Sequence, residues 1–386
     1  MDESPVDHVK IGLLLPTTGV DSAQGTDTAR GFELYLKKFG HRAGGREMRI
    51  LKENDEAKPE LALAKIKKLI EGDGVDFVVG PISSAVALAI RNYVHEHDTP
   101  LLVPAAFTRV LTSPQQASPN IFRLSETSDQ ANYPMGVWMM KHTKYRKVIV
   151  MAADFAGGRH SVEAFMAGFR SCGGEIAAEI YPPFGTSDFA RYLREADSIQ
   201  ADAVYAWFAG ADAVHFVKQY KQYGRDKQLP LTGHSALTVD TILPAIGDAA
   251  LGVVTVGAYS AALETQENKK FVREYDAAYE TWPSRYSECG WVAAALIGTA
   301  LDTLKGDLSN GGRVRDELKN ALPKIKPPRG PMQFDAYRQA ISPIYITRTE
   351  KSAERLVNVV IDQIPAVSQE ATWGWWNKSS HSSQNS

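Results

Sequence analysis

The sequence predicts an α/β protein made of two Rossmann-like lobes, each with a mostly parallel sheet covered by helices. Short apolar stretches of strand length alternate with amphipathic stretches of helical length from residue 9 onward, and this alternation is typical of βαβ units. The plan of residues 9–106 recurs over 146–224, with Gly44-Gly45 before one strand and Gly173-Gly174 before its counterpart. Two copies of one plan predict two similar lobes with a ligand cleft between the carboxyl ends of their strands.

The composition indicates a globular protein whose partners are small molecules or other proteins. The chain has 386 residues, of which 44% are hydrophobic and 23% charged, and its formal net charge is −2. This balance provides no basic surface for nucleic acid or for an anionic membrane. No apolar run approaches the roughly 20 residues that a membrane-spanning helix needs, so direct membrane insertion is not expected.

The first half begins with short apolar runs separated by stretches that have one apolar helical face. Strands are expected at 9–16, 48–55, 77–79 and 100–105, and helices at 26–39, 59–70 and 85–95. Pro59 stands at the first position of its helix, where a missing N–H costs nothing. Gly80-Pro81 turns the chain after the strand 77–79, and Ser83 or Ser84 then caps the next helix.

The second half repeats these elements and adds a set of late segments. Its strands are expected at 146–154, 173–183 and 201–210, and its helices at 161–170, 188–196 and 213–224. The late segments predict a strand at 252–260, helices at 271–281 and 287–304, and a β-hairpin over 331–348. Because these segments contain too few strands for a sheet of their own, we expect them to complete the first two lobes through several chain crossings.

The side chains that follow the predicted strands are suited to recognition rather than catalysis, because they are hydroxyl groups, aromatic rings, small residues and a guanidinium group. They are Ser83, Ser84, Ala105, Ala106, Phe107 and Arg109 in the first half, and Asp154, Phe155, Gly157, Trp207, Phe208 and Ser235 in the second. From the pattern alone, the two serines fit either a helix cap or an anion site at the helix start. Trp207 fits a core position as well as a site position.

Motifs for catalysis and cofactor binding are weak. The stretch 233–237, Gly-His-Ser-Ala-Leu, lacks the final glycine of a serine-hydrolase nucleophile elbow, and no G-x-G-x-x-G or Walker A sequence follows a predicted strand. His95 and His97 are two residues apart on a predicted helix, so they point away from a shared metal. Cys172 and Cys289 show no metal-ligand spacing. We therefore expect no enzyme activity, no cofactor and no metal.

Seven stretches along the chain carry a family resemblance. They are VKIGLLLPTTG, NDEAKPELALAKIKKLI, VDFVVGPISS, LLVPAAFT, NIFRLS, AADFAGGRHSVEAF and TALD. In this order they resemble the type I periplasmic solute-binding proteins of ABC transporters, in the leucine/isoleucine/valine-binding family, and the resemblance spans about residues 9–365.

The resemblance implies a periplasmic-binding-protein-like I fold with a three-crossing hinge. The lobes implied are 9–125 plus 259–330 and 126–258 plus 331–372, followed by a flexible tail at 373–386. It also implies a monomer in the periplasm, with its signal peptide removed, that delivers a small-molecule ligand to an ABC transporter permease.

The resemblance further assigns candidate ligand-binding residues by their place in the family's motifs. The family's anion-binding serine corresponds to Ser84 or its neighbour Ser83, which favours a ligand role for them over capping alone. The positions that surround the ligand correspond to Ala105, Ala106, Phe107, Phe155, Gly157, Phe208, Ser235 and Tyr286, where Tyr286 matches an aromatic residue that covers the ligand.

Three of these positions depart from amino-acid binders of the family. Phe107 stands where those proteins have a hydroxyl group, Gly157 where they have an aromatic residue, and Ser235 where they have an acid that neutralises the ligand's ammonium group. A buried ammonium without a counter-charge is costly. The departures therefore predict a small carboxylate without an ammonium group, an aromatic acid rather than an amino acid, with its ring in the space that Gly157 opens.

A second function is compatible with this fold: the ligand-sensing domain of a regulator or receptor, with a small amino acid or amide as its ligand. A sensor normally carries an output domain or a dimer face, and the polar stretch after Pro365 predicts neither. The sequence upstream of Met1 would separate the two functions, because a secretory signal there supports transport.

Overall fold

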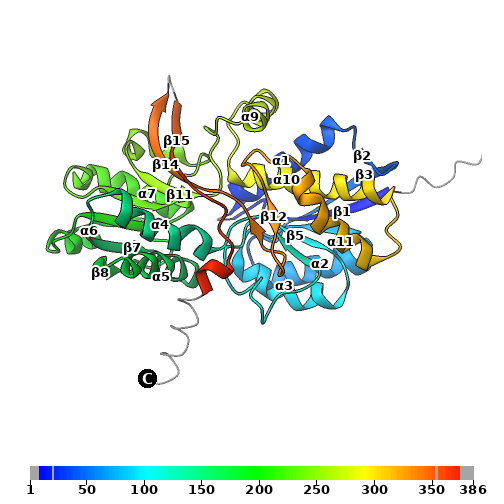
Figure 1. Cartoon of the computed structure of the whole chain (residues 1–386), viewed down its shortest axis with the longest axis horizontal. Coiled ribbons are helices and arrows are strands. Elements are labelled where there is room, and N and C mark those ends of the chain that lie inside the picture. The colour runs from blue at the N-terminus through cyan, green and yellow to red at the C-terminus, as the bar shows by residue number, and fades with distance from the viewer. Residues whose placement is uncertain (1–7, 20, 353–354, 374–386) are drawn as a thin grey trace, which may run out of the picture. The chain divides into compact units, whose positions relative to one another are not determined.

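The chain is divided into two compact units, which are drawn in Figure 1. The computed structural model describes residues 8–19, 21–352 and 355–373. Unit 1 is Met1–Ser125 with Glu264–Ser342, and unit 2 is Glu126–Leu263 with Pro343–Ser386. The chain thus passes from one unit to the other after residues 125, 263 and 342, whereas the sequence predicted passages after 125, 258 and 330. Most of the predicted tail, from residue 374 onward, lies outside the described residues.

Unit 1 contains a six-stranded sheet in the order β2-β3-β1-β4-β5-β6. Its strands are β1 His8–Leu14, β2 Arg42–Ala43, β3 Arg46–Glu53, β4 Phe77–Val79, β5 Leu101–Val103 and β6 Ile121–Arg123. All neighbouring pairs are parallel except β2 with β3. The parallel pairs need helical crossovers, and these follow the predicted alternation of strand and helix.

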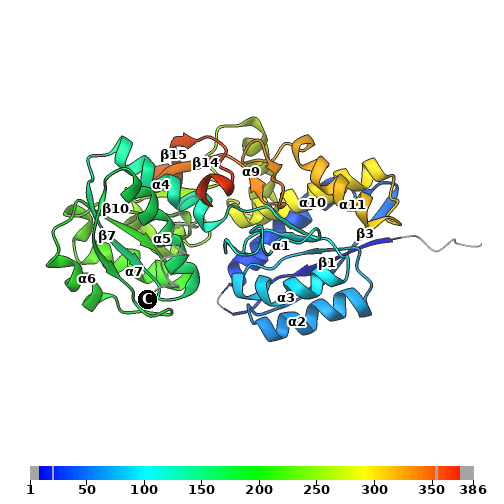
Figure 2. The same cartoon turned by 60° about the horizontal axis from the view of Figure 1, so that its bottom comes forward.

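The helices of unit 1 cover both faces of this sheet. They are α1 Ser22–Lys38, α2 Pro59–Lys67, α3 Ser84–Glu96, α9 Gln266–Tyr279, α10 Arg285–Leu304 and α11 Gly311–Ala321. Figure 2 shows α2 and α3 side by side on one face, and α10 and α11 on the other. Gly31 on α1 and Gly290 on α10 allow these two helices to touch, because a β-carbon at either would overlap the backbone of the other helix.

Unit 2 contains a seven-stranded sheet in the order β15-β14-β11-β10-β9-β7-β8. Its strands are β7 Lys147–Ala152, β8 Glu175–Ile180, β9 Ala203–Trp207, β10 Leu231–His234, β11 Val254–Gly257, β14 Ile344–Ser352 and β15 Arg355–Ile364. The order β8-β7-β9-β10-β11 repeats the order β3-β1-β4-β5-β6 of unit 1, and all of these neighbours are parallel. The predicted α/β fold with two Rossmann-like sheets is therefore confirmed.

The core of unit 2 lies on both faces of its sheet, as a parallel sheet requires. Along β7, Ile149 and Met151 enter one apolar cluster, while Val148 and Val150 enter the cluster on the opposite face. The covering helices are α4 Ser128–His142, α5 Ala156–Ser171, α6 Ala190–Asp197, α7 Gly210–Gln222 and the short α8 Leu243–Ile246. In the described part of the chain, no helix combines the length and the apolar character needed to cross a membrane.

The late segments differ from the single hairpin predicted over 331–348. β12 Gln333–Phe334 pairs with β13 Ala340–Ile341, whereas β14 leaves this hairpin and pairs antiparallel with β11 and with β15, a strand the sequence analysis did not predict. The hairpin of β12 and β13 belongs to unit 1, because Gln339 donates to the Ser125 carbonyl at 2.7 Å and Arg123 donates its backbone N–H to the Arg338 carbonyl at 3.0 Å.

Candidate ligand-binding site

The start of α3 presents hydrogen-bond donors at the carboxyl end of β4. Ser83 is the N-cap residue by position, but its side chain makes no capping hydrogen bond. Ser84 Oγ instead accepts a hydrogen bond from the Thr108 backbone N–H at 3.2 Å, so it joins the α3 loop to the loop after β5. Neither serine side chain caps the helix, which favours the anion site over the capping interpretation. A helix start of this kind attracts negative charge through its N–H groups and its dipole.

The loop after β5 is held by buried hydrogen bonds. Ala105 and Ala106 are fully buried, and the Ala106 N–H donates to the Ile82 carbonyl at 2.9 Å. Arg123, also fully buried, donates to the Ala106 carbonyl at 2.8 Å and to the Thr108 carbonyl. The two alanines therefore shape the loop through their backbone, and their side chains point into the protein.

A guanidinium group that the sequence analysis missed lies beside Phe107. The Arg285 guanidinium stands 4.2 Å from the centre of the Phe107 ring and 5.6 Å from that of Tyr286. Arg285 is only 4% exposed and Tyr286 is buried as well. One face of Phe107 is thus taken by a cation, and this face is not open to a ligand ring.

The start of α10 that carries Arg285 and Tyr286 is anchored by a buried carboxylate. Ser284 caps α10 and donates its hydroxyl hydrogen to Asp27 on α1, which also accepts from the Tyr275 hydroxyl. Burial raises the pKa of Asp27, while the hydrogen bonds from Ser284 and Tyr275 oppose that rise. This network orients the first turn of α10 from the side of the core.

Unit 2 carries three aromatic rings in contact at the carboxyl ends of β7 and β9. The Phe155 ring centre lies 5.1 Å from that of Phe184 and 5.4 Å from that of Trp207. Phe155 is 37% exposed, Phe184 is 58% exposed and Trp207 lies buried behind them. We call these three residues the aromatic cluster. Phe184 was not predicted, because it lies in the loop after β8 and only the fold brings it to Phe155.

Gly157 does not open free space, in contrast to the prediction. A β-carbon at this position would stand 2.7 Å from Cε2 of Phe155. The room left by the missing side chain is thus occupied by the ring of the residue two positions earlier, and any ligand ring would meet the aromatic cluster instead.

This arrangement predicts different losses of stability when two neighbouring glycines of α5 are replaced by alanine. We expect Gly157→Ala to change the free energy of unfolding by less than about 1 kcal/mol, because the exposed Phe155 ring can move aside and alanine favours the helix. Gly158→Ala should cost about 1–3 kcal/mol, because its β-carbon would overlap the Ala153 carbonyl oxygen of the backbone. Urea unfolding of both variants checks this, and equal losses would contradict the proposed mobility of Phe155.

Phe208 has a packing role rather than the predicted site role. Its ring is fully buried and lies 4.5 Å from the centre of the Phe216 ring and 5.2 Å from that of Phe189. The alternation of β9 continues into Phe208 and directs it to the core face opposite Trp207. We therefore leave it out of the candidate site.

Ser235 lies in the short 3-10 turn that follows β10, and a buried carboxylate stands close to it. A β-carbon added to Gly257 would touch the Ser235 side chain and would stand 4.0 Å from Oε1 of Glu126. Glu126 Oε1 also lies 3.8 Å from Nε2 of His234, and both side chains are almost fully buried. Because Ser235 replaces the family's acid, no counter-charge was expected in this region, and the position of Glu126 corrects that prediction.

The two remaining charged candidates have different surroundings. Asp154 forms an exposed ion pair with Arg159 at 2.6 Å, and the hydrogen bond from Arg159 lowers the pKa of the Asp154 carboxyl group. Arg109 is buried in the loop after β5. Of these two, Arg109 adds positive charge near the loops of unit 1 described above, together with Arg123 and Arg285.

Comparison with known proteins identifies the family. The sequence pattern of the family described as "Periplasmic binding protein" matches residues 8–354. The chain belongs to the periplasmic binding protein family. This periplasmic binding protein is 29% identical over 272 residues to "Leu/Ile/Val-binding protein homolog 6" of Brucella melitensis, in a match that covers 69% of this chain and 68% of the relative.

Two solved structures of solute-binding proteins of ABC transporters are similar over nearly their whole length. One, from R. palustris in complex with benzoate, is 30% identical with a TM-score of 0.86, and the match covers 95% of this chain and 99% of that one. The other, from Rhodopseudomonas palustris BisB5 in complex with 3,4-dihydroxybenzoic acid, is 31% identical with a TM-score of 0.86, covering 94% and 98%. The predicted resemblance to solute-binding proteins of the Leu/Ile/Val-binding type is confirmed.

Proposed function

We propose that this periplasmic binding protein is the ligand-binding component of an ABC importer and that its ligand is an aromatic carboxylate. The observation that carries the proposal is the aromatic cluster of Phe155, Phe184 and Trp207, in which two rings are exposed at the carboxyl ends of the strands of unit 2. Exposed apolar residues that lie side by side, unlike single ones, are typical of binding sites, and each ring pair with a ligand adds about 0.5–1.5 kcal/mol beyond burial.

The features of unit 1 support a negatively charged group on the ligand. The start of α3 offers backbone N–H groups, the hydroxyl of Ser83 and the hydroxyl of Ser84. Arg285 adds a positive charge beside Phe107. Hydrogen bonds from such groups to a carboxylate are about twice as strong as those between neutral partners. These features of unit 1 favour a ligand that carries a carboxylate.

The two similar structures with benzoate and 3,4-dihydroxybenzoate support the same ligand class. Both ligands combine one carboxylate with one ring and lack an ammonium group. The matched proteins are also solute-binding proteins of ABC transporters, which supports delivery to a permease and an extracytoplasmic site of action.

An amino acid is the second candidate ligand, and the position of Glu126 is the observation that favours it. Its carboxylate near Ser235 and His234 supplies the negative charge that an ammonium group needs. The same carboxylate suits a ring hydroxyl, which can donate a hydrogen bond to it. Glu126 therefore favours a hydroxybenzoate over benzoate among the aromatic acids. It favours an amino acid over an aromatic acid that has no ring hydroxyl.

Titration calorimetry with matched ligands tests the proposal. We expect saturable binding of benzoate and 3,4-dihydroxybenzoate, and binding of benzamide that is weaker by at least about tenfold, because benzamide keeps the ring but loses the charge. Leucine and phenylalanine should give no comparable heat. Binding of leucine without any response to the two benzoates would overturn the aromatic proposal and favour the amino acid.

The importer role is tested separately, by uptake of radiolabelled ligand into cells. Deletion of the gene should abolish high-affinity uptake of the ligand found by calorimetry, and a plasmid copy should restore it. Normal uptake in the deletion strain, together with tight binding in vitro, would contradict the transport role and favour a sensor.

A further inference from the structure

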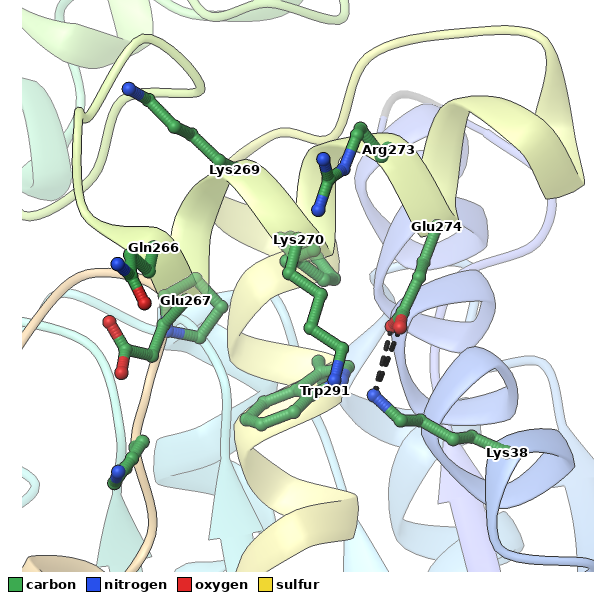
Figure 3. Close-up of a pocket in the computed structure, with 11 residues that line it drawn as sticks. Lys38, Gln266, Glu267, Lys269, Lys270, Arg273, Glu274 and Trp291 are labelled. Atoms are coloured by element: carbon green, nitrogen blue, oxygen red, sulfur yellow. Dashed lines mark hydrogen bonds and ion pairs between the residues drawn. The ribbon is translucent and has the colours of Figure 1, made fainter.

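A basic pocket of about 530 Å³ opens on unit 1, apart from the loops discussed above. Figure 3 shows its main side chains, which come from α1, α9 and α10. The lining residues are Lys38, Gln266, Glu267, Lys269, Lys270, Phe271, Arg273, Glu274, Trp291, Lys326 and Pro328. None of the predicted ligand-binding residues is among them, so this pocket is a separate feature that the proposed function leaves unexplained.

The frame of the basic pocket is rigid. Lys38 ends α1 and Trp291 stands on α10, and these are the helices that the glycines at 31 and 290 bring into backbone contact. Phe271 on α9 packs against Trp291, with ring centres 6.1 Å apart. Because three packed helices hold the walls, the pocket needs little reorganisation to receive a ligand.

Positive charge dominates the basic pocket. Five cations and two carboxylates line it, which leaves an excess of three positive charges. Lys38 is paired with Glu274 at 3.0 Å, and Lys269 with Glu264, outside the lining, at 2.5 Å. Among the described residues, the side chains of Lys270, Arg273 and Lys326 form no ion pair or hydrogen bond. Three cations from two segments of chain thus remain available for an anion.

An indole ring forms part of the pocket wall. Between Arg285 and Ala300 on α10, only Trp291 and Thr299 are not buried. Tyr35 holds the indole from one side in an edge-on contact, with ring centres 5.3 Å apart. In Figure 3 the Lys270 and Lys38 side chains reach toward Trp291, whereas Lys269 is directed away. The pocket therefore combines a fixed aromatic surface with nearby cations.

We propose that the basic pocket is a second ligand site, which binds a planar organic polyanion. The charged groups of the ligand pair with Lys270, Arg273 and Lys326, and its ring packs against Trp291. A pocket volume of 530 Å³ is in the range typical of small-molecule sites. A single negative charge would leave much of the excess positive charge uncompensated, so at least two charges are expected.

Titration calorimetry with two probes tests the proposal on the full chain. Adenosine 5′-diphosphate supplies a planar ring with several negative charges, and pyrophosphate supplies similar charges without the ring. We expect saturable binding of both probes. The affinity for adenosine 5′-diphosphate should be about tenfold higher than that for pyrophosphate, because its ring contacts Trp291. Affinity for both should fall as salt is raised. Absence of heat from both probes at millimolar concentration in low salt would overturn the proposal.

Matched variants connect the binding to this pocket. The double variant Lys270→Gln with Arg273→Gln should weaken the binding of both probes by at least about tenfold. Trp291→Leu should weaken the binding of the nucleotide only. Lys319→Gln is the control, because Lys319 is exposed on α11 of the same unit and does not line the pocket. Unchanged affinities in the double variant would show that the probes bind elsewhere and would overturn the assignment. None of these variants touches the proposed site for aromatic carboxylates, so benzoate binding should stay unchanged and each proposal can fail alone.

Discussion

Replacement of Arg329 by methionine is expected to lower the free energy of unfolding by about 3–5 kcal/mol, the loss typical of a buried ion pair deprived of one partner. Arg329 donates to Glu288 from Nε at 2.8 Å and also from Nη2, and both side chains are almost fully buried. Arg329 Nη1 donates in addition to the Leu124 carbonyl at 3.3 Å, just before the chain leaves unit 1. Without the guanidinium group, the Glu288 carboxylate stays in an apolar interior. Urea unfolding measures the loss.

Two controls give this result its meaning. Arg313→Met removes an exposed partner of Asp307, 3.5 Å away, and should cost at most about 1 kcal/mol. The double variant Arg329→Met with Glu288→Met should recover most of the loss, because it removes both buried charges. A loss in Arg329→Met no larger than in Arg313→Met would mean that the pair adds nothing to the stability of unit 1.

Most strands and most helices could be predicted because their apolar patterns are local, although the short strands β2, β6 and β10 were not among those predicted. The strand expected at 77–79 is β4, Phe77–Val79, and the serine helix expected from 85 begins at Ser84. β15 escaped prediction because its burial is weak: of its ten residues only Val357 and Asn358 are buried. Its sequence contains the short apolar runs Leu356-Val357 and Val359–Ile361, but Asn358 separates them, and they were not predicted as a strand.

The candidate site could be predicted only in part, because its chemistry depends on side chains that are distant in sequence. Ser84 was accessible from the turn and helix around it, whereas Arg285 meets Phe107 only through packing of α10. Glu126 reaches the region of Ser235 and His234 in the same way. A substitution pattern can show that an acid is missing at one position. It cannot show that another acid occupies the same space.

Ser84→Asp is expected to weaken binding of benzoate by at least about hundredfold, since two like charges held together cost several kcal/mol. Ser84 is the first residue of α3, and an acidic side chain at this position stabilises a helix. The fold should therefore tolerate the substitution, while the new carboxylate occupies the place proposed for the carboxylate of the ligand. Titration calorimetry measures the affinity, and thermal unfolding shows that the variant is folded.

Ser84→Asn is the matched control for this prediction, because asparagine has the shape of aspartate without its charge. Its side-chain oxygen can still accept from the Thr108 N–H that Ser84 Oγ binds at 3.2 Å, and its amide can donate to a ligand. We expect a loss of affinity of about tenfold or less. If Ser84→Asp and Ser84→Asn weaken the binding of benzoate equally, the effect comes from the shape of the side chain. The carboxylate of benzoate then does not bind at the start of α3. Benzamide carries no charge. Its affinities for the two variants should differ far less than those of benzoate, because the new carboxylate repels only a charged ligand.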